Sequence, residues 1–247
     1  MQIKGSIIVV TGSGKGIGKD IAIEIARLGG ICIICSRSKN DIDQTVDEIK
    51  KLGGAAFGYK IDLTIEKEVS DFTEWINQKF DGIDVLVNNA GGYPKNFYSD
   101  DKKQPTYVWD WSYELWKKTI DINLDTAFLM TKYITPIMIS KSSGKIINIG
   151  SRMGRIASQM GGYAAAKAAL ISLTKTTAIQ VADKGIEVNA ICPTVIDTDS
   201  QRIYNKSIGN DAIEMENTTG IINTVKYLIQ DAPRTMTGQS IDLFKTV

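Results

Sequence analysis

Short apolar runs alternate with amphipathic stretches along most of the chain. The run from Ser6 to Thr11 is continuously apolar, as expected for a strand buried on both faces, and the segment after it repeats apolar residues at helical spacing. We predict an α/β fold with a doubly wound, mostly parallel, seven-stranded sheet that has helices on both faces. The predicted strands are 6–11, 30–36, 56–61, 83–88, 145–150, 187–192 and 239–244, and the predicted helices lie near 17–28, 40–52, 66–79, 112–138, 162–183 and 218–230.

A glycine-rich turn, Gly12 to Gly18, joins the first predicted strand to the first predicted helix. Glycine permits a tight turn, and the N-terminus of a helix presents unpaired N–H groups to an anion. The spacing matches neither the Gly-x-Gly-x-x-Gly pattern nor a P-loop. Taken alone, the turn is either a nucleotide phosphate site or simply a flexible connection.

Tyr163 and Lys167 lie four residues apart, on one face of a predicted helix. A nearby cation favours a phenolate, so we expect Lys167 to lower the pKa of Tyr163 from roughly 10 and to prepare it for proton transfer. Two other Tyr-Lys pairs share this spacing, but neither has the same setting. Here a buried strand, 145–150, ends beside Ser151 just before the helix, which is where open α/β sheets bind ligands.

Composition narrows the possible chemistry. The 247 residues are 43% hydrophobic and 23% charged, which suits one compact domain spanning residues 1–247. The chain has no histidine, which excludes Ser-His-Asp hydrolysis and histidine metal ligands, and we expect no metal site. A net charge of +1 argues against nucleic-acid binding, and no apolar run reaches the roughly 18 residues of a membrane span. We expect a cytoplasmic protein with neither a nucleic-acid nor a membrane partner.

The cysteines offer no clear alternative chemistry. Cys32 and Cys35 have a C-x-x-C spacing, but they fall inside a predicted strand, where residues three apart face opposite sides of the sheet. We therefore interpret them as buried strand residues, and Cys192 lies in a similar apolar strand.

Four ordered motifs together resemble the short-chain dehydrogenase/reductase family, in its compact single-domain branch, and are similar to its 3-oxoacyl reductases. They are Thr11-Gly-Ser-Gly-Lys-Gly-Ile-Gly18, Asn88-Asn-Ala-Gly91, Asn123 in Asp121-Ile-Asn-Leu, and Ser151 with Tyr163 and Lys167. The resemblance implies a Rossmann-type sheet and hydride transfer between a nicotinamide and a small-molecule carbonyl or secondary alcohol. It also implies a homodimer or homotetramer.

The resemblance also implies residue roles. Tyr163 would exchange a proton with the substrate oxygen, Lys167 would hold the nicotinamide ribose, and Ser151 would hold the substrate oxygen. Asn123 would support a water beside Lys167, or is a structural amide within a helix. Asp62 would contact adenine, or caps the next helix. The implied cofactor-binding residues are Gly12, Ser13, Lys15, Gly16, Ile17, Gly18, Arg37, Asp62, Leu63, Asn89, Ala90, Gly91, Tyr163, Lys167, Pro193 and Val195.

The charges after the second strand bear on the choice of cofactor. In a dinucleotide fold an acidic residue there binds the ribose 2'-hydroxyl, whereas a cation accommodates a 2'-phosphate. Here Arg37 follows the strand, and no carboxylate is available until Asp41. Arg37 and Lys15 therefore favour NADP(H), with NAD(H) possible if both are ordinary solvated charges.

Three features depart from the family pattern. Pro193-Thr194 replaces the usual Pro-Gly, and the interval from Ser151 to Tyr163 is one residue short, which would displace Ser151. The usual glycine-containing tail is replaced by Lys245-Thr-Val247, which puts subunit contacts in doubt. Two other functions therefore stay open: an NAD-dependent alcohol dehydrogenase, and a catalytically weak dinucleotide-binding regulatory module.

Two segments bear on the substrate. The segment 92–116 is rich in tyrosine and tryptophan and either walls the substrate pocket or forms a subunit interface. The segment 197–217 occupies the position of the family's substrate lid. It is polar and shows no clear hydrophobic helical face, so we expect a mobile or open lid.

Overall fold

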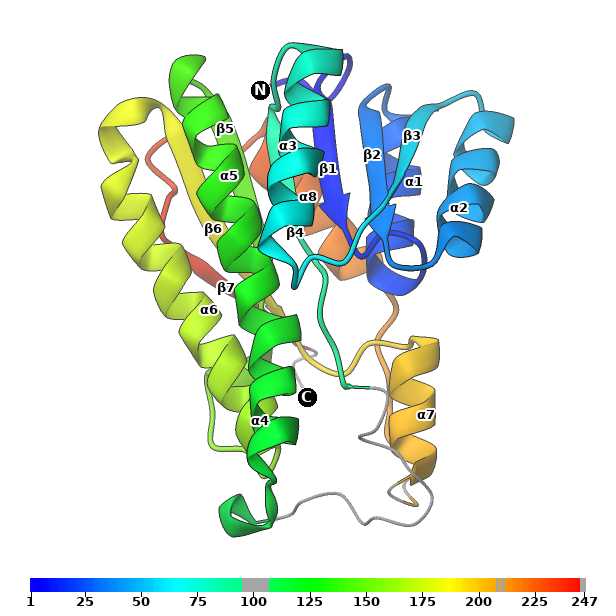
Figure 1. The fold of residues 1–247 in the computed structure, drawn as a ribbon, viewed down its shortest axis with the longest axis vertical. Coiled ribbons are helices and arrows are strands. Elements are labelled where there is room, and N and C mark those ends of the chain that lie inside the picture. The colour runs from blue at the N-terminus through cyan, green and yellow to red at the C-terminus, as the bar shows by residue number, and fades with distance from the viewer. Residues whose placement is uncertain (95–106, 208, 210–211, 245–247) are drawn as a thin grey trace.

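The computed structural model describes residues 1–94, 107–207, 209 and 212–244, and Figure 1 shows its fold. Seven strands form one sheet in the order β3-β2-β1-β4-β5-β6-β7, and every pair of neighbours is parallel. The predicted doubly wound parallel sheet is confirmed. The strands are β1 (Ile7–Thr11), β2 (Ile31–Ser36), β3 (Ala55–Lys60), β4 (Val85–Asn88), β5 (Gly144–Ile149), β6 (Ile186–Pro193) and β7 (Ser240–Leu243).

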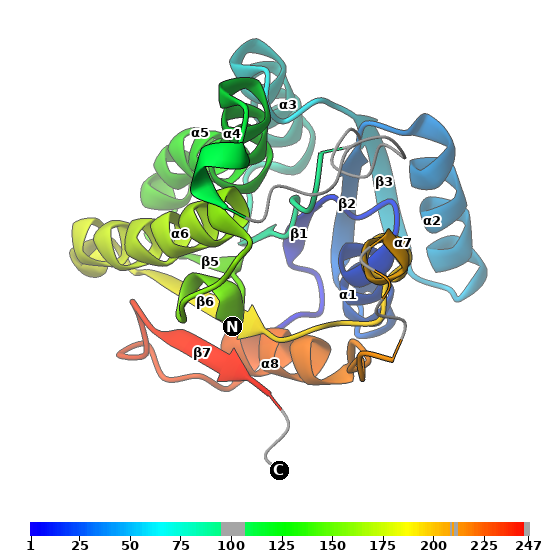
Figure 2. The same cartoon turned by 90° about the horizontal axis from the view of Figure 1, so that it is seen from below.

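Helices cover both faces of the sheet, as Figure 2 shows from below. Successive strand residues face opposite sides, so Ile8 packs into one apolar core and Val9 into the other. One face is covered by α1 (Gly16–Arg27), α2 (Lys39–Lys51) and α8 (Thr219–Gln230). The other is covered by α3 (Glu66–Phe80), α5 (Thr126–Ser140) and α6 (Gly161–Gln180).

Two segments differ from the sequence prediction. The single helix predicted near 112–138 is divided into α4 (Tyr113–Ile120), a π-helical turn η3 (Asp121–Asp125) and α5. Within the predicted lid lies a helix, α7 (Asp199–Ser207), which its polar sequence did not indicate. Among the helices in the described ranges, none has the length and apolar character needed to cross a bilayer.

The buried-strand interpretation of the cysteine pair is confirmed. Cys32 and Cys35 lie in β2 and belong to opposite apolar cores. The Cys32 thiol donates to the Ala22 carbonyl at 3.3 Å, and the Cys35 thiol donates to the Val10 carbonyl at 3.7 Å. Burial raises the pKa of each thiol to about 12, so both stay protonated near neutral pH.

Candidate active site

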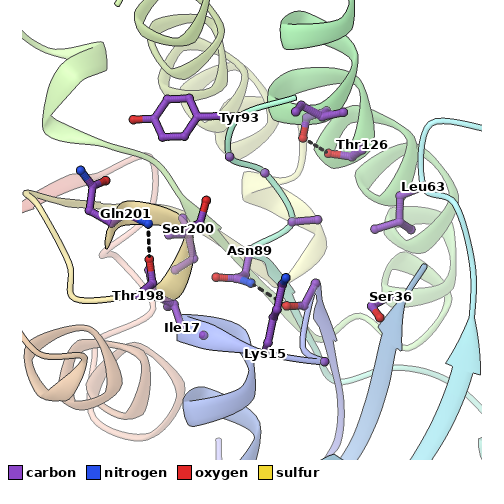
Figure 3. A pocket seen from close by; sticks show the side chains of 18 of the residues that line it. Lys15, Ile17, Ser36, Leu63, Asn89, Tyr93, Thr126, Thr198, Ser200 and Gln201 are labelled. Atoms are coloured by element: carbon purple, nitrogen blue, oxygen red, sulfur yellow. Dashed lines mark hydrogen bonds between the residues drawn. The ribbon is translucent and has the colours of Figure 1, made fainter. Parts of the chain in front are cut away.

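A cavity of about 720 Å³ opens at the carboxyl ends of the strands, beside the point between β1 and β4 where the strand order reverses. Ligands bind at this point in open α/β sheets. Figure 3 shows side chains that reach the cavity from several loops, including Lys15, Asn89 and Tyr93. The predicted residues that line it are Gly12, Lys15, Gly16, Ile17, Arg37, Asp62, Leu63, Asn89, Ala90, Gly91, Ser151, Tyr163, Lys167 and Pro193.

Thr11, at the end of β1, joins the glycine loop to the segment that follows β4. Its Oγ1 accepts hydrogen bonds from the backbone N–H groups of Asn89 and Ala90, each at 2.9 Å. Asn89 Nδ2 donates back to the Thr11 carbonyl at 2.9 Å. A Cβ on Gly18 would lie 2.4 Å from that Nδ2 atom, so position 18 has no room for a side chain. Two motifs that are distant in the sequence therefore form one wall.

The start of α1 is suited to an anion. Gly12 and Gly16 have φ angles of +63° and +57°, which favour glycine. The N-cap residue, Lys15, makes no side-chain capping hydrogen bond, and the first turn contains no acidic residue. The first N–H groups of the helix, together with its dipole, therefore present positive charge at the cavity. The phosphates of a dinucleotide fit this end of the helix.

Both cations predicted to select the cofactor line the cavity. The side chains of Lys15 and Arg37 are exposed at its wall. Asp41, in the first turn of α2, lines the cavity as well. A Cβ on Gly14 would lie 2.9 Å from both the Asp41 Cβ and the Ser36 Oγ, so Asp41 packs close to the glycine loop. The wall thus combines two cations with one carboxylate.

Ser151, Tyr163 and Lys167 line the same cavity. Lys167 Nζ donates to the Ile149 carbonyl at 2.8 Å and lies 5.8 Å from the centre of the Tyr163 ring. The Ser151 hydroxyl lies close enough to Tyr163 to lower the pKa of its phenol. The shortened interval between these two residues therefore does not displace Ser151.

A short 3-10 helix, η4 (Arg152–Gly154), accommodates the shortened interval. Ser151 caps this helix, because its Oγ accepts a hydrogen bond from the Met153 N–H at 3.2 Å. A Cβ on Gly154 would lie only 2.6 Å from the Lys167 carbonyl carbon. The glycine lets η4 pack directly on α6, which keeps Ser151 beside the helix that carries Tyr163.

Burial changes the proton affinities of both titratable groups. It lowers the pKa of Lys167 to about 8, because the ammonium group loses solvent. Burial also raises the pKa of Tyr163, and the Ser151 hydroxyl only partly opposes that rise. The expectation that Lys167 lowers the pKa of Tyr163 is therefore wrong for this structure. The phenol is kept protonated, so it is available as a proton donor.

Asn123 is buried in the π-helical turn and does not line the cavity. Its Oδ1 accepts from the Gly92 N–H at 2.8 Å, and its Nδ2 donates to the Gly92 carbonyl at 2.8 Å and to the Thr119 carbonyl at 2.9 Å. A Cβ on Gly91 would lie 2.8 Å from the Asn123 Oδ1 and 3.4 Å from the Lys167 Nζ. Asn123 thus clamps the loop after β4, and it lies close to Lys167.

Three other predicted residues lie behind the cavity wall. Ser13 is buried, and its Oγ donates to the Val10 carbonyl at 2.5 Å and accepts from the Cys35 N–H at 3.1 Å. Gly18 packs against Asn89, and the place predicted for Val195 is taken by its neighbour Ile196, which lines the cavity. These residues shape the wall from behind.

Asp62 lines the cavity and does not cap α3. Its Oδ1 accepts hydrogen bonds from the Thr64 N–H at 3.0 Å and the Thr64 hydroxyl at 2.7 Å. The N-cap of α3 is Ile65, which makes no side-chain capping bond. The carboxylate therefore stabilises the turn before the helix, and the helix-cap alternative is wrong in this respect.

Several lining residues were not predicted. Thr126 and Tyr93 project from the segments after η3 and β4, and Thr198 precedes α7, where its Oγ1 accepts from the Gln201 N–H at 3.2 Å. Ser36 ends β2. These residues belong to no motif used above, although Tyr93 begins the aromatic segment and Thr198 begins the lid segment, which were the available signals.

The aromatic segment serves more than one purpose. Tyr93 lines the cavity, whereas Trp111 covers the start of α6, where a Cβ on Gly162 would lie 2.7 Å from the indole ring. Trp109 is 76% exposed. Residues 95–106 of this segment, and the C-terminal residues 245–247, lie outside the described residues. The pocket-wall interpretation thus holds for Tyr93, and Trp111 packs beside the helix that carries Tyr163.

Comparison with known proteins agrees with this geometry. The family model for short chain dehydrogenase matches residues 6–208. The 3-oxoacyl-[acyl-carrier-protein] reductase FabG of Staphylococcus epidermidis is 33% identical over 241 residues, covering 94% of this chain and 95% of the relative.

Two solved structures are also similar to this chain. A 7α-hydroxysteroid dehydrogenase complexed with NADH and 7-oxo glycochenodeoxycholic acid is 29% identical, has a TM-score of 0.85 and covers 98% of this chain and 94% of that one. A protein assigned as an NAD(P)-dependent gluconate 5-dehydrogenase, from Beutenbergia cavernae and with bound NADP, is 26% identical with a TM-score of 0.87, covering 98% and 97% of the two chains. This chain therefore belongs to the short chain dehydrogenase family, and it is an oxidoreductase of that family.

Proposed function

We propose that this oxidoreductase transfers a hydride between NADP(H) and a carbonyl or secondary alcohol substrate, with Tyr163 as general acid in reduction and general base in oxidation. The observation that carries the proposal is that Ser151, Tyr163 and Lys167 line one cavity together with the glycine loop. A proton donor, a hydroxyl and a buried cation thus face the space where a dinucleotide fits.

The nicotinamide supplies or accepts the hydride when it is bound. The chain supplies the proton, because the hydroxyl of Tyr163 is kept protonated and donates to the substrate oxygen during reduction. Ser151, which lines the cavity together with Tyr163, holds the same oxygen. Lys167 is protonated below its pKa of about 8, so near neutral pH it brings a positive charge and hydrogen-bond donors to the cavity. We also propose that Lys167 holds the cofactor ribose and that Asn123 supports a water beside it.

The charges at the ribose end of the cavity support NADP(H). Lys15 and Arg37 are both exposed at the wall, and guanidinium and ammonium groups bind phosphate through charge-assisted hydrogen bonds. The similar protein from Beutenbergia cavernae carries NADP. Asp41 is the observation that favours the alternative, an NAD-dependent alcohol dehydrogenase, because its carboxylate would repel a 2'-phosphate.

The substrate is proposed only as a class. The similar proteins act, by their names, on a 3-oxoacyl-[acyl-carrier-protein], a gluconate and a hydroxysteroid, and these share a carbonyl or CH–OH group. The cytoplasmic location and the assembly into a homodimer or homotetramer stay predictions from the sequence, as does one domain spanning residues 1–247.

The test is oxidation of NADPH and of NADH by the purified protein over a panel of ketones, aldehydes and 3-oxoacyl thioesters. We expect at least one compound to be reduced, with a higher kcat/KM for NADPH than for NADH. Turnover with NADH alone would favour the alcohol dehydrogenase. Tight NADPH binding with no turnover of any compound in either direction would contradict the proposal and favour a dinucleotide-binding regulatory module.

A further inference from the structure

A ladder of three tyrosine rings connects the lid helix α7 with the catalytic helix α6. The ring of Tyr93 lies 5.3 Å from that of Tyr163, centre to centre, with the planes tilted by 39°. The ring of Tyr204, from α7, stacks on Tyr93 as well, with the ring centres 5.0 Å apart and the planes 16° from parallel. Offset-stacked and tilted rings at these separations attract one another beyond their buried area.

Tyr93 is itself fixed to the start of α6. Its hydroxyl donates to the Sδ atom of Met160 at 3.6 Å, and Met160 is the N-cap residue of α6. Its backbone follows Gly92, which Asn123 clamps by two hydrogen bonds. The middle ring of the ladder is therefore held from two directions, and it offers α7 a rigid surface.

Helix α7 contributes one wall of the cavity through Asp199, Ser200 and Gln201 in its first turn. Its hydrogen bonds and ion pairs with its own segment include Arg202 to Asp197, at 2.6 and 2.8 Å. Such contacts stiffen the segment, but they do not determine where the segment sits. The Tyr204 ring, in contrast, contacts a residue that follows β4. Figure 1 shows α7 set apart from α6, with the chain that follows β4 running between them.

We propose that Tyr93 is a positioning residue: its ring receives Tyr204 and holds α7 in place beside Tyr163. The inference rests on the proposed function only for the catalytic role of Tyr163. Loss of the contact between the Tyr93 and Tyr204 rings would let α7 move away from α6, and one wall of the cavity would move with it. If a ligand binds only when the lid is closed, its apparent affinity falls as the closed fraction of the protein falls.

Trypsin offers a direct test, because α7 carries two cleavage sites, Arg202 and Lys206. Cleavage within a helix requires local opening, so its rate reports how often α7 opens. We expect Tyr204→Ala and Tyr93→Ala each to speed cleavage at these sites by about 3- to 10-fold, as loss of an aromatic pair predicts. Tyr204→Phe keeps the ring that stacks on Tyr93 and should cleave at the wild-type rate.

The variants also distinguish faster cleavage caused by loss of the ring contact from faster cleavage caused by a general loss of stability. Alanine has a higher helix propensity than tyrosine, so faster cleavage of Tyr204→Ala cannot come from a weaker helix. Tyr93 is remote in sequence from both cleavage sites, so it does not alter what trypsin recognises. The midpoint of thermal unfolding is measured for each variant, and Tyr93→Leu is run beside Tyr93→Ala as a variant that keeps more apolar volume.

The double variant Tyr93→Ala/Tyr204→Ala is the decisive test. If both substitutions act by removing the same ring contact, this variant should be cleaved no faster than the single variant that is cleaved more quickly. Multiplied effects, or wild-type cleavage of Tyr93→Leu, would overturn the proposal. The assay needs neither cofactor nor substrate, so a lack of turnover would contradict the proposed function without affecting this test. Where turnover is found, Tyr204→Ala should raise the KM for NADPH by about 3- to 10-fold and Tyr204→Phe should restore it.

Discussion

Lys167 shows at the scale of one residue how the site trades stability for chemistry. It is buried, and its pKa of about 8 lies below the 10.5 of an exposed lysine. Between these two values the unfolded chain binds more protons than the folded protein, so folding stability rises with pH across this window. The penalty is fully present below pH 8 and amounts to about 3 kcal/mol.

We therefore predict a difference in pH dependence between the wild-type protein and Lys167→Met. The free energy of unfolding, from urea denaturation between pH 7.5 and 10, should rise with pH more steeply in the wild type. Lys50→Met, on the exposed side of α2, is the matched control and should keep the wild-type slope. Parallel curves for the wild type and Lys167→Met would contradict the claim that burial lowers the pKa of Lys167.

Gly18 is a residue at which the glycine loop packs tightly against the Asn89 segment. A Cβ there would also lie 2.7 Å from the Gly12 carbonyl oxygen, which is backbone and cannot swing away. Gly18→Ala should therefore lower the free energy of unfolding by about 1–3 kcal/mol and weaken NADPH binding. Gly220→Ala, in α8, is the control: the nearest atom would be 4.0 Å away, so this variant should be neutral or more stable by up to about 1 kcal/mol. Equal stability of the two variants would contradict the packing argument.

Motif spacing located the residues of the loop and the Tyr163-Lys167 pair, because residues that are close in the sequence of one turn or one helix are also close in space. Motif spacing did not predict how burial shifts the pKa values of these residues. The direction of the Tyr163 pKa depends on solvent exclusion by elements far away in the sequence, and no local pattern contains that information. For the same reason the shortened interval before Tyr163 appeared to matter, although η4 absorbs it.

At the scale of an element, the π-helical turn η3 holds part of the site in place. Such turns are rare and often occur at functional sites. It presents Asn123 to the backbone of Gly92, where an unbroken α-helix would have placed this side chain differently. The turn thereby fixes the loop that carries Tyr93.

We predict that Asn123→Ala lowers the free energy of unfolding by about 1–3 kcal/mol, because both hydrogen bonds to Gly92 are lost. Asn77→Ala, on the exposed side of α3, should change it by no more than about 0.5 kcal/mol. Chemical denaturation of the two variants checks this. A similar small change in both would mean that the clamp contributes little.

Helix periodicity could not identify either η3 or α7. A π turn keeps nearly the same apolar spacing as the helices around it, and α7 is polar because much of it faces solvent and the cavity. Strands, in contrast, were predictable, because each is an apolar run bounded by turn residues. The carboxyl ends of those runs located the site.

At the scale of the whole molecule, parallel order brings the ends of six strands, β1 to β6, to one cavity, and binding there should stabilise the entire fold. NADPH at about 100 times its Kd should raise the thermal midpoint by roughly 5 to 10 °C. NADH at the same concentration should raise it less, because it offers no 2'-phosphate to Lys15 and Arg37.

Arg37→Ala should remove most of the NADPH advantage, weakening NADPH binding about tenfold and leaving NADH binding unchanged. Arg234→Ala is the control, since this side chain is 80% exposed and is 4.0 Å from Glu187, away from the cavity. Calorimetric titration of both cofactors into the three proteins checks the prediction. Equal weakening of NADPH and NADH would place Arg37 outside the phosphate site.

The central claim is that Tyr163 transfers the proton, and the rate of hydride transfer in Tyr163→Phe tests it most directly. This substitution removes one hydroxyl and keeps the ring on which Tyr93 packs. With a substrate found by the panel, we predict that the single-turnover rate falls at least about 100-fold while the Kd for NADPH changes less than about threefold. A rate equal to that of the wild type, with NADPH bound normally, would contradict the account.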